Sequence, residues 1–336
     1  MNTQTKVMAV DRLATRIPRV EETEELVKVK AKLVVADCIT EDDIIKAATE
    51  ADVIITRYAP MTRRVMAALP KCKAIVRYGI GYDTIDVDAA TDNNILVINI
   101  PDFCLQEVPN HVIMLLLVCA KRLLLFDTLT KQGRWDEWRR IQLPMVSIYE
   151  QTLGLVGCGK IGQMIARKAR CFDLRILAYD PYLDKSLIKE LGITLVSLPE
   201  LLKESDFVSV NTPSTRETWH LIGEKEFKQM KPTAYFINTA RGPVVDEAAL
   251  IKALQKKWIA GAGLDVFEHE PIDPDNPLLK MDNVFVTPHI ASYSDAAFKR
   301  LRTSVGQEAA RVLKGQWPRN VVNRSVKPKV NLTQEV

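Results

Sequence analysis

A glycine-rich turn in the middle of the chain constrains the fold more than any other feature. Residues 152–156 form a short apolar run, and Gly157, Gly159 and Gly162 follow at the G-x-G-x-x-G spacing. The first glycine of such a turn permits the sharp reversal, the second lets the backbone approach a pyrophosphate, and the third lets the next helix pack closely. A helix-like stretch, residues 163–170, comes next, and its N-terminal N–H groups would face the phosphates. The pattern predicts a dinucleotide-binding unit, although alone it also fits a tightly packed turn.

An acidic residue at the end of the next predicted strand supports the dinucleotide interpretation. Residues 174–179 are mostly apolar and Asp180 follows them, close to the ~20 residues beyond the glycines that such sites require. A carboxylate there can accept hydrogen bonds from the adenosine ribose and would repel a 2′-phosphate, so it favours NAD over NADP. Two alternatives stay open: Lys185 lies near enough to admit NADP, and Asp180-Pro181 also fits the start of a plain turn.

Apolar, β-branched runs alternate with helical patterns along most of the chain, which is typical of parallel sheets with crossover helices. The predicted strands form two series: 7–10, 33–36, 53–56, 74–77 and 95–98, then 152–156, 175–179, 207–211, 234–238, 260–266 and 284–287. Thr40 is placed to cap the helix after the second strand.

The order of these segments predicts how the domains are arranged. The glycine turn opens the second series, and a purely helical pattern, residues 294–313, follows it. We therefore predict an α/β protein with two Rossmann- or flavodoxin-like doubly wound domains. An NAD-binding domain of residues 105–289 would be inserted into a substrate domain of residues 1–104 plus 290–336. Residues 326–336 lack periodicity and are expected to form a loose tail.

Composition excludes several classes of protein. The 336 residues are 47% hydrophobic and 26% charged, with a net charge of +4, which is ordinary for a globular enzyme. The densest basic patch, residues 134–140, interleaves tryptophan with charge but contains two acids, so we expect no nucleic-acid binding. The apolar run 112–120 is shorter than the ~20 residues a membrane span needs. The six cysteines form no C-x-x-C pair and the N-terminus has no apolar signal region, so we predict a cytoplasmic protein with reduced thiols and no metal site.

Three ionisable residues stand just past predicted strands of the second series: Arg241, Glu270 and His289. Since the carboxyl ends of parallel strands meet at one edge of a sheet, these residues are expected to share a site. Histidine is suited to exchange a proton with a carbonyl oxygen near neutral pH. A carboxylate would orient the imidazole, and an arginine fork can hold a substrate carboxylate. Each residue singly also fits a structural role at a turn or strand end, so the combination behind a nucleotide turn carries the prediction.

Several motifs carry a resemblance to a known family. They are Gly157-x-Gly159-x-x-Gly162, Tyr179-Asp180-Pro181, residues 237–247 (INTARGPVVDE), residues 263–271 (GLDVFEHEP) and Thr287-Pro288-His289-Ile290. From residue 50 to residue 320 the chain resembles the D-isomer-specific 2-hydroxyacid dehydrogenases. Within that family it is most similar to the branch that includes the C-terminal-binding-protein co-repressors.

The resemblance implies a role for each matching residue. Arg241 would hold the substrate carboxylate, Glu270 would partner His289, and His289 would be the general acid and base. Asp265 would hold the carboxamide of the nicotinamide. Further residues would line the cofactor together with the glycine turn and Asp180: Lys160, Ile161, Thr212, Pro213, Thr218 and Thr239.

Residues 77–83 (RYGIGYD) match the glycine loop with which the family binds its substrate. The resemblance implies that the backbone N–H groups of this loop meet the substrate carboxylate, at Tyr78, Gly79, Ile80 and Gly81. The residue types agree, because glycine lets backbone donors approach an anion closely. Tyr78, Ile80 and Tyr82 further suggest a partly apolar pocket.

These features predict an NAD-dependent dehydrogenase acting on a small D-2-hydroxy acid or 2-oxo acid, such as glyoxylate or hydroxypyruvate. The alternative is an NAD(H)-sensing scaffold or co-repressor-like binding protein with weak dehydrogenase activity. The resemblance also implies a homodimer built on the apolar helix 112–125, whereas the residues alone equally fit an interior helix. His111 is assigned to this interface helix, His220 to local packing and His269 to the solvent beside Glu270.

Overall fold

The computed structural model divides the chain into two compact units. The first unit comprises Met1–Cys104 and Ser294–Val336, and the second comprises Leu105–Tyr293. The structure describes residues 5–140, 145, 147–183 and 186–334. Lys185, which the sequence interpretation set beside the cofactor, lies outside the described residues.

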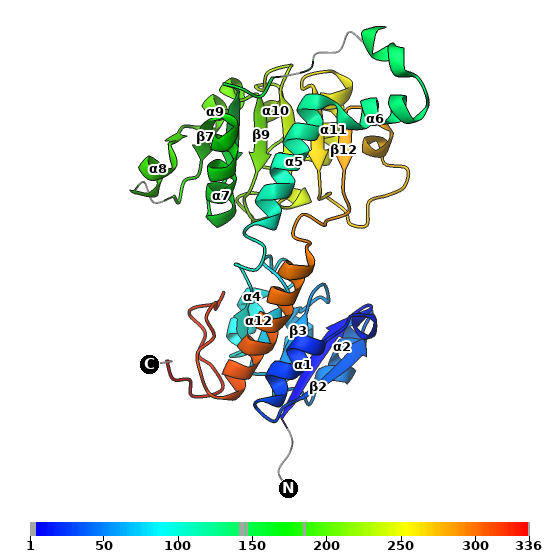
Figure 1. Ribbon diagram of the computed structural model, residues 1–336. Coiled ribbons are helices and arrows are strands. Elements are labelled where there is room, and N and C mark those ends of the chain that lie inside the picture. Colours follow the sequence, from blue (N-terminus) through cyan, green and yellow to red (C-terminus); the bar gives the residue numbers. More distant parts are fainter. Residues whose placement is uncertain (1–4, 141–144, 146, 184–185, 335–336) are drawn as a thin grey trace. The chain divides into compact units, whose positions relative to one another are not determined.

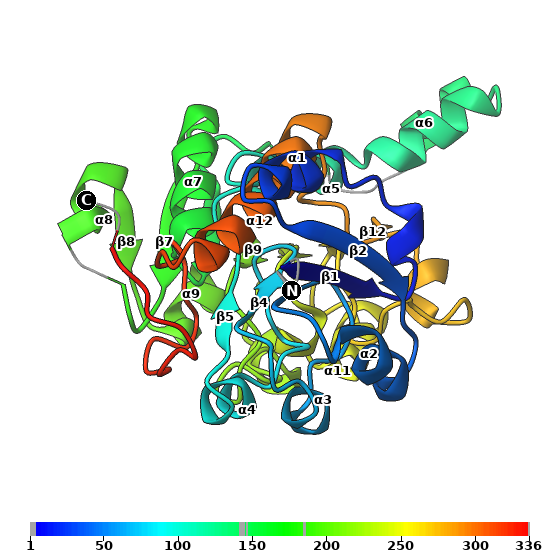
Figure 2. The same ribbon diagram turned by 90° about the horizontal axis from the view of Figure 1, so that it is seen from below.

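The first unit is built on a five-stranded sheet whose strands pair in parallel in the order β2-β1-β3-β4-β5. The strands are β1 (Lys6–Asp11), β2 (Lys32–Asp37), β3 (Val53–Thr56), β4 (Ala74–Arg77) and β5 (Leu96–Ile98). This order is that of flavodoxin-like folds. Figure 2 shows α1 (Val20–Val27) and α12 (Asp295–Leu313) on one face of the sheet, and α2 (Glu41–Ala48), α3 (Arg63–Ala67) and α4 (Val87–Asp92) on the other.

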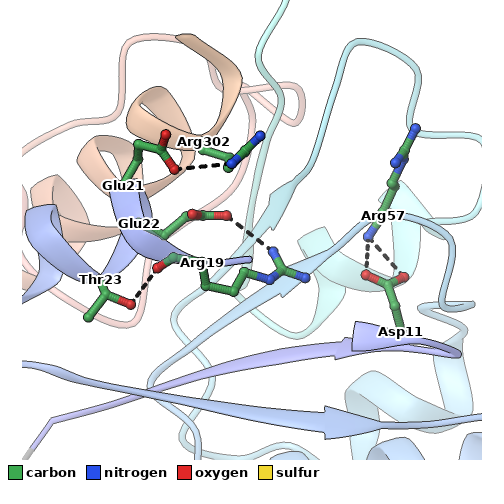
Figure 3. A network of polar contacts seen from close by, with 7 residues as sticks. All are labelled: Asp11, Arg19, Glu21, Glu22, Thr23, Arg57 and Arg302. Carbon is green, nitrogen blue, oxygen red and sulfur yellow. Dashed lines mark hydrogen bonds and ion pairs between the residues drawn. The ribbon is translucent and has the colours of Figure 1, made fainter. Parts of the chain in front are cut away.

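Polar contacts fix the loops of the first unit (Figure 3). The buried carboxylate of Asp11, at the end of β1, accepts backbone N–H bonds from Arg57, Tyr58 and Ala59, which satisfies the turn after β3. The predicted cap is confirmed, because the Thr40 hydroxyl accepts from the backbone N–H of Asp43 at the start of α2.

The prediction that residues 326–336 form a loose tail is wrong. Val326 is buried, and the ammonium of Lys329 donates to the carbonyls of Leu69 and Pro70. Further along, Thr333 and Gly315 are joined by a backbone hydrogen bond of 2.8 Å. The segment lacks periodicity because it is held by separate backbone contacts rather than by a helix or a full strand.

The second unit contains a seven-stranded parallel sheet in the order β12-β11-β10-β9-β6-β7-β8 (Figure 1). The strands are β6 (Thr152–Val156), β7 (Arg175–Tyr179), β8 (Ile193–Leu195), β9 (Phe207–Val210), β10 (Tyr235–Asn238), β11 (Gly261–Leu264) and β12 (Val284–Val286). Helices cover both faces, which is why β6, β9, β10 and β11 are buried along their whole length.

Two hydrophobic clusters lie on opposite faces of this sheet. The first includes side chains of α5 (Glu107–Lys121) and α7 (Lys160–Ala169), with α8 (Ser186–Leu191) beside them. The second includes side chains of α9 (Leu198–Glu204), α10 (Glu224–Phe227) and α11 (Glu247–Gln255). The predicted fold class is confirmed, because both sheets are parallel and carry helices on each face.

The second unit differs from the predicted elements in two places. The edge strand β8 was missed, because three residues after a short helix give no clear alternation. The long apolar helix is broken at Arg122, whose left-handed backbone (φ 49°) ends α5 and starts α6 (Leu123–Lys131). Short 3-10 turns complete the fold: η1 (Ala14–Arg16), η2 (Trp135–Arg140), η3 (Arg170–Phe172), η4 (Gly242–Val244) and η5 (Pro277–Lys280). Among the described residues, no helix combines the length and apolar character required to cross a membrane.

Candidate active site

The glycine turn lies where the strand order of the second sheet reverses, between β6 and β9. Gly157 has a positive φ of 91°, and a Cβ added there would lie 3.0 Å from backbone atoms of Asn211 and Thr212. A Cβ at Gly162 would lie 2.6 Å from the carbonyl oxygen of Gly157. At Gly159 an added Cβ would meet nothing within 4 Å. The first and third glycines therefore serve close packing, and the second leaves open space at the start of α7, which fits a bound pyrophosphate.

Asp180 is fixed against this turn. Its carboxylate accepts the backbone N–H of Cys158 at 2.8 Å and that of Tyr182 at 2.9 Å, one bond to each oxygen. The residue as a whole is half-buried. Burial, together with the charge of Asp180, raises the pKa of the Cys158 thiol to about 11, so this cysteine stays protonated at neutral pH.

The other predicted cofactor residues lie around the same strand ends. Lys160 and Ile161 are in the first turn of α7, with Lys160 exposed and Ile161 half-buried. Thr212 and Pro213 follow β9, and the hydroxyl of Thr218 donates to the carbonyl of Pro213 at 2.6 Å, so Thr218 closes this loop on itself. Thr239, after β10, is 7% exposed, and its hydroxyl has no hydrogen-bond partner among the described residues. A buried hydroxyl left without a partner fits a site that is completed by a ligand.

Arg241, Glu270 and His289 follow β10, β11 and β12, and the structure brings Glu270 and His289 into contact. His289 Nδ1 and Glu270 Oε2 are 2.6 Å apart, with each side chain about one-third exposed. Glu270 Oε1 accepts the backbone N–H of Phe267 at 3.1 Å. Arg241 turns its guanidinium partly onto its own chain, through a 2.7 Å bond to the carbonyl of Ala240.

Arg241 acts electrostatically on the pKa of Glu270. Burial pushes the pKa of Glu270 up, but the hydrogen bond and charge of His289, the N–H of Phe267 and the charge of Arg241 together hold it below its ordinary value. Glu270 is therefore a carboxylate at neutral pH. It can keep the Nδ1 atom of His289 oriented while the outer nitrogen is left to face a substrate.

A buried carboxylate holds the backbone on which His289 stands. Asp265 has no exposed surface, and its oxygens accept the Thr287 hydroxyl at 2.5 Å and the backbone N–H groups of Ile290 and Ala291 at 2.9 and 2.8 Å. The carbonyl of Asp265 also accepts the N–H of His289, which has a left-handed backbone with φ 55°. These hydrogen bonds of Asp265 thus stabilise the left-handed backbone of His289, which is unfavourable for a non-glycine residue.

His111 lies in α5, the helix to which the sequence assigned it, and its ring also joins this network. Its Nε2 lies 2.9 Å from the Thr287 hydroxyl and 3.7 Å from Asp265. Burial lowers the pKa of His111 against the opposing charge of Asp265, so the ring is neutral and donates to Thr287. No pattern near His111 signals this contact, since only the tertiary fold places α5 beside the end of β12.

In the first unit, the glycine loop follows β4. Tyr78 donates its N–H to Thr56 at 2.7 Å, and the carbonyls of Gly79 and Ile80 accept from Ile100 and Asn99 at 2.9 and 2.7 Å. Gly79 has φ 138°, a conformation that requires glycine.

The prediction that the Tyr78 side chain lines an apolar pocket is wrong. The residue is 3% exposed, and the guanidinium carbon of Arg19 lies 5.1 Å from the centre of its ring. Burial, together with the charge of Glu22, raises the pKa of Tyr78. Figure 3 shows Arg19 and Glu22 as a buried ion pair at the start of α1. The backbone of Tyr78 is also engaged, because its N–H donates to Thr56 and its carbonyl accepts from the Arg77 side chain. Ile80, Gly81 and Tyr82 keep exposed surface.

Comparison with known proteins identifies the family. The model of the D-isomer specific 2-hydroxyacid dehydrogenase NAD-binding domain matches residues 113–291. The chain is 42% identical over 285 residues to glyoxylate reductase of Korarchaeum cryptofilum, covering 84% of this chain and 86% of that one. The chain belongs to the D-isomer-specific 2-hydroxyacid dehydrogenases.

Two further relatives widen the comparison. The dehydrogenase is 37% identical over 308 residues to D-3-phosphoglycerate dehydrogenase of Methanocaldococcus jannaschii, covering 91% of this chain and 58% of that one. A solved structure of D-lactate dehydrogenase from Aquifex aeolicus, complexed with NAD and lactic acid, superposes with a TM-score of 0.83 at 31% identity, covering 94% of this chain and 99% of that one.

The protein is thus an NAD-linked oxidoreductase of hydroxy acids and oxo acids, and the non-catalytic alternative is not favoured. When bound, NAD(H) supplies or accepts the hydride at the substrate carbon. The residues described above fit that cofactor: a turn open at Gly159, an acid fixed at Asp180 and an unpartnered hydroxyl at Thr239.

Proposed function

We propose that this dehydrogenase interconverts a small 2-oxo acid and its D-2-hydroxy acid, with glyoxylate and hydroxypyruvate as the first candidates. The observation that carries the proposal is the 2.6 Å contact between His289 and an ionised Glu270, with the charge of Arg241 acting on the same carboxylate. Similarity to glyoxylate reductases supports the choice of substrate.

His289 is the proton donor and acceptor in this proposal. In the direction of reduction, its Nε2 gives a proton to the oxo oxygen, and in oxidation it takes that proton back. Glu270 holds Nδ1 and so fixes which nitrogen faces the substrate. Arg241 binds the substrate carboxylate through its planar fork. In the first unit, the glycine loop is proposed to bind the same class of anion through the N–H groups of Ile80 and Gly81, because those of Tyr78 and Gly79 already donate to Thr56 and Arg77.

The cofactor residues are proposed by position. Gly157, Gly159 and Gly162, with Lys160 and Ile161, would receive the pyrophosphate at the start of α7. Asp180 would bind the adenosine ribose. Thr212, Pro213, Thr218 and Thr239 would line the site along the ends of β9 and β10. Asp265 was predicted to hold the nicotinamide carboxamide, but its side chain has no exposed surface and both oxygens accept hydrogen bonds, so we propose that it supports the backbone of His289 instead.

The test is a panel of 2-oxo acids assayed for NADH oxidation, with wild-type protein and the His289→Gln variant. We expect turnover of at least one small 2-oxo acid by the wild type. The variant should lose about 100-fold or more in kcat while its NADH affinity, read by fluorescence titration, stays the same. Activity of His289→Gln equal to the wild type would remove the proposed proton donor.

We also propose that the protein is a homodimer. Apolar side chains are exposed along α5, α6 and η2 of the second unit: Met114, Leu123, Leu124, Trp135 and Trp138, each at least 41% exposed. Apolar surface gathered on neighbouring elements is typical of an interface between copies of a chain. Sedimentation of a species at the chain mass of 37.9 kDa alone would contradict the dimer.

We also propose a cytoplasmic location. None of the six cysteines forms a disulfide, and five are buried. Unpaired thiols are typical of a reducing compartment. Subcellular fractionation with an antibody to the protein would test the location, and recovery with a secreted or membrane fraction would contradict it.

A further inference from the structure

His220 joins three segments of the second unit that are far apart in the chain. It ends the loop that begins with Thr212, and its backbone is left-handed, with φ 49°. Its backbone N–H donates to the carbonyl of Pro243 at 2.9 Å. Its ring nitrogen Nε2 lies 2.9 Å from Glu268 Oε1. The sequence interpretation assigned His220 to local packing, but its ring and its backbone hold two different loops.

One of these loops carries Glu270. Glu268 is two residues before Glu270, and its second carboxylate oxygen accepts the backbone N–H of Glu247 at 3.2 Å. Its own N–H donates to the side chain of Glu247 at 3.0 Å. Glu268 therefore faces His220 and the start of α11, while Glu270 faces His289. The contact with His220 therefore holds a residue two positions before the partner of the proton donor.

The other loop carries Arg241. Pro243, which accepts the His220 N–H, is two residues after Arg241. Between them, Gly242 packs so closely on the second loop that an added Cβ would lie 1.8 Å from the carbonyl oxygen of Phe267. The loops of Arg241 and Glu270 are thus in backbone contact, and His220 contacts both of them.

We propose that His220 is a positioning residue that sets the spacing of Arg241 and Glu270 by holding Pro243 with its backbone and Glu268 with its ring. Trp219 stacks on the imidazole, with ring centres 4.7 Å apart and an angle of 21° between planes, and this limits rotation of the ring. The inference rests on the proposed roles of Arg241 and Glu270, since it concerns their geometry.

Two substitutions separate the ring contact from the backbone. His220→Asn keeps a residue type that tolerates a left-handed backbone, but its amide nitrogen stands where Nδ1 does and falls short of Glu268. His220→Gln is less suited to that backbone, but its amide can reach the carboxylate. If the hydrogen bond to Glu268 positions the loops, the glutamine variant is the more active of the two. If only the backbone matters, the order is reversed.

We expect His220→Asn to lose about 10- to 100-fold in kcat/KM for the 2-oxo acid, through both a lower kcat and a higher KM, because a displacement of about 1 Å at a reacting group has effects of this size. NADH affinity and the midpoint of thermal unfolding should match the wild type. His220→Gln should recover most of the loss. His269→Gln, in which an exposed histidine of the neighbouring loop is replaced, is the matched control and should behave as the wild type.

Three results would overturn the inference: wild-type kcat and KM in His220→Asn, no recovery in His220→Gln, or a parallel loss of NADH binding and thermal stability. His289→Gln, measured alongside, separates this inference from the proposed function. An active His289→Gln variant contradicts the function itself. An inactive one, next to a fully active His220→Asn variant, contradicts only the positioning role.

Discussion

Replacing Gly242 with alanine should push apart the loops that carry Arg241 and Glu270, and the structure gives the size of the clash. The added Cβ would lie 1.8 Å from the carbonyl oxygen of Phe267, 2.0 Å from its carbon and 2.5 Å from the nitrogen of Glu268. All three are backbone atoms, so no side chain can turn away. The first distance falls short of the 3.4 Å at which ordinary contact begins by about 1.6 Å, and the loops must move apart to accommodate it.

That movement has two measurable effects of different size. Forcing an extra methyl group into a packed region costs about 1–3 kcal/mol of unfolding free energy. A displacement above 1 Å between a substrate clamp and the partner of the proton donor costs about 100-fold or more in rate. We therefore expect Gly242→Ala to fold, with a modestly lower urea midpoint. Its kcat/KM for the 2-oxo acid should fall about 100-fold or more.

The assay combines urea unfolding, followed by tryptophan fluorescence, with steady-state reduction of the best 2-oxo acid. Gly223→Ala is a suitable control, because the nearest atom to an added Cβ there is 3.6 Å away, which is ordinary contact. Wild-type kcat/KM in Gly242→Ala would refute the reasoning, because the loops would then tolerate displacement without effect on the reaction.

Three further predictions concern the cofactor and the pH. Gly159→Ala should leave stability unchanged, since an added Cβ meets nothing within 4 Å, but should weaken NADH binding by occupying the space at the start of α7; equal NADH affinity in a fluorescence titration would contradict this. Asp180→Ala should raise kcat/KM with NADPH relative to NADH, because the charge that repels a 2′-phosphate is gone; an unchanged ratio would argue against the ribose role. The depressed pKa of Glu270 means that its carboxylate stabilises the fold at neutral pH and that this contribution is lost as the pH falls below 4.5. Glu270→Gln should therefore be less stable than the wild type at pH 7, with the difference shrinking in acid; a constant difference in urea midpoint would exclude this linkage.

The sequence predicts the parts of the fold that depend on local patterns. The eleven predicted strands overlap every strand of the two sheets except β8. Buried parallel strands are short runs of β-branched and apolar residues, which makes them recognisable in the sequence. The turn after β6 was found from its glycines, since only glycine fits the φ of 91° at Gly157.

The sequence could not predict contacts that depend on which elements become neighbours. Nothing near His111 in the chain indicates that its ring meets Thr287, 176 residues away, or that His220 meets Glu268 across 48 residues. Tyr78 was misplaced for the same reason: its neighbours in sequence suggest a pocket, while the ring packs on Arg19 from another element. At Arg122 a left-handed residue with a side chain breaks a helix whose apolar pattern continues.

The pairing of α12 with α1 has a consequence for the order in which the protein is made. Gly306 of α12 lies so close to Glu22 of α1 that an added Cβ would be 2.9 Å from its Cα, and Asn323 binds the backbone of Val97 across 226 residues. A chain emerging from the ribosome holds Leu105–Tyr293 complete while the N-terminal sheet still lacks α12, one of the two helices on that face. The nucleotide-binding unit can therefore finish folding first during synthesis, while the N-terminal sheet has only α1 on the face that α12 later shares.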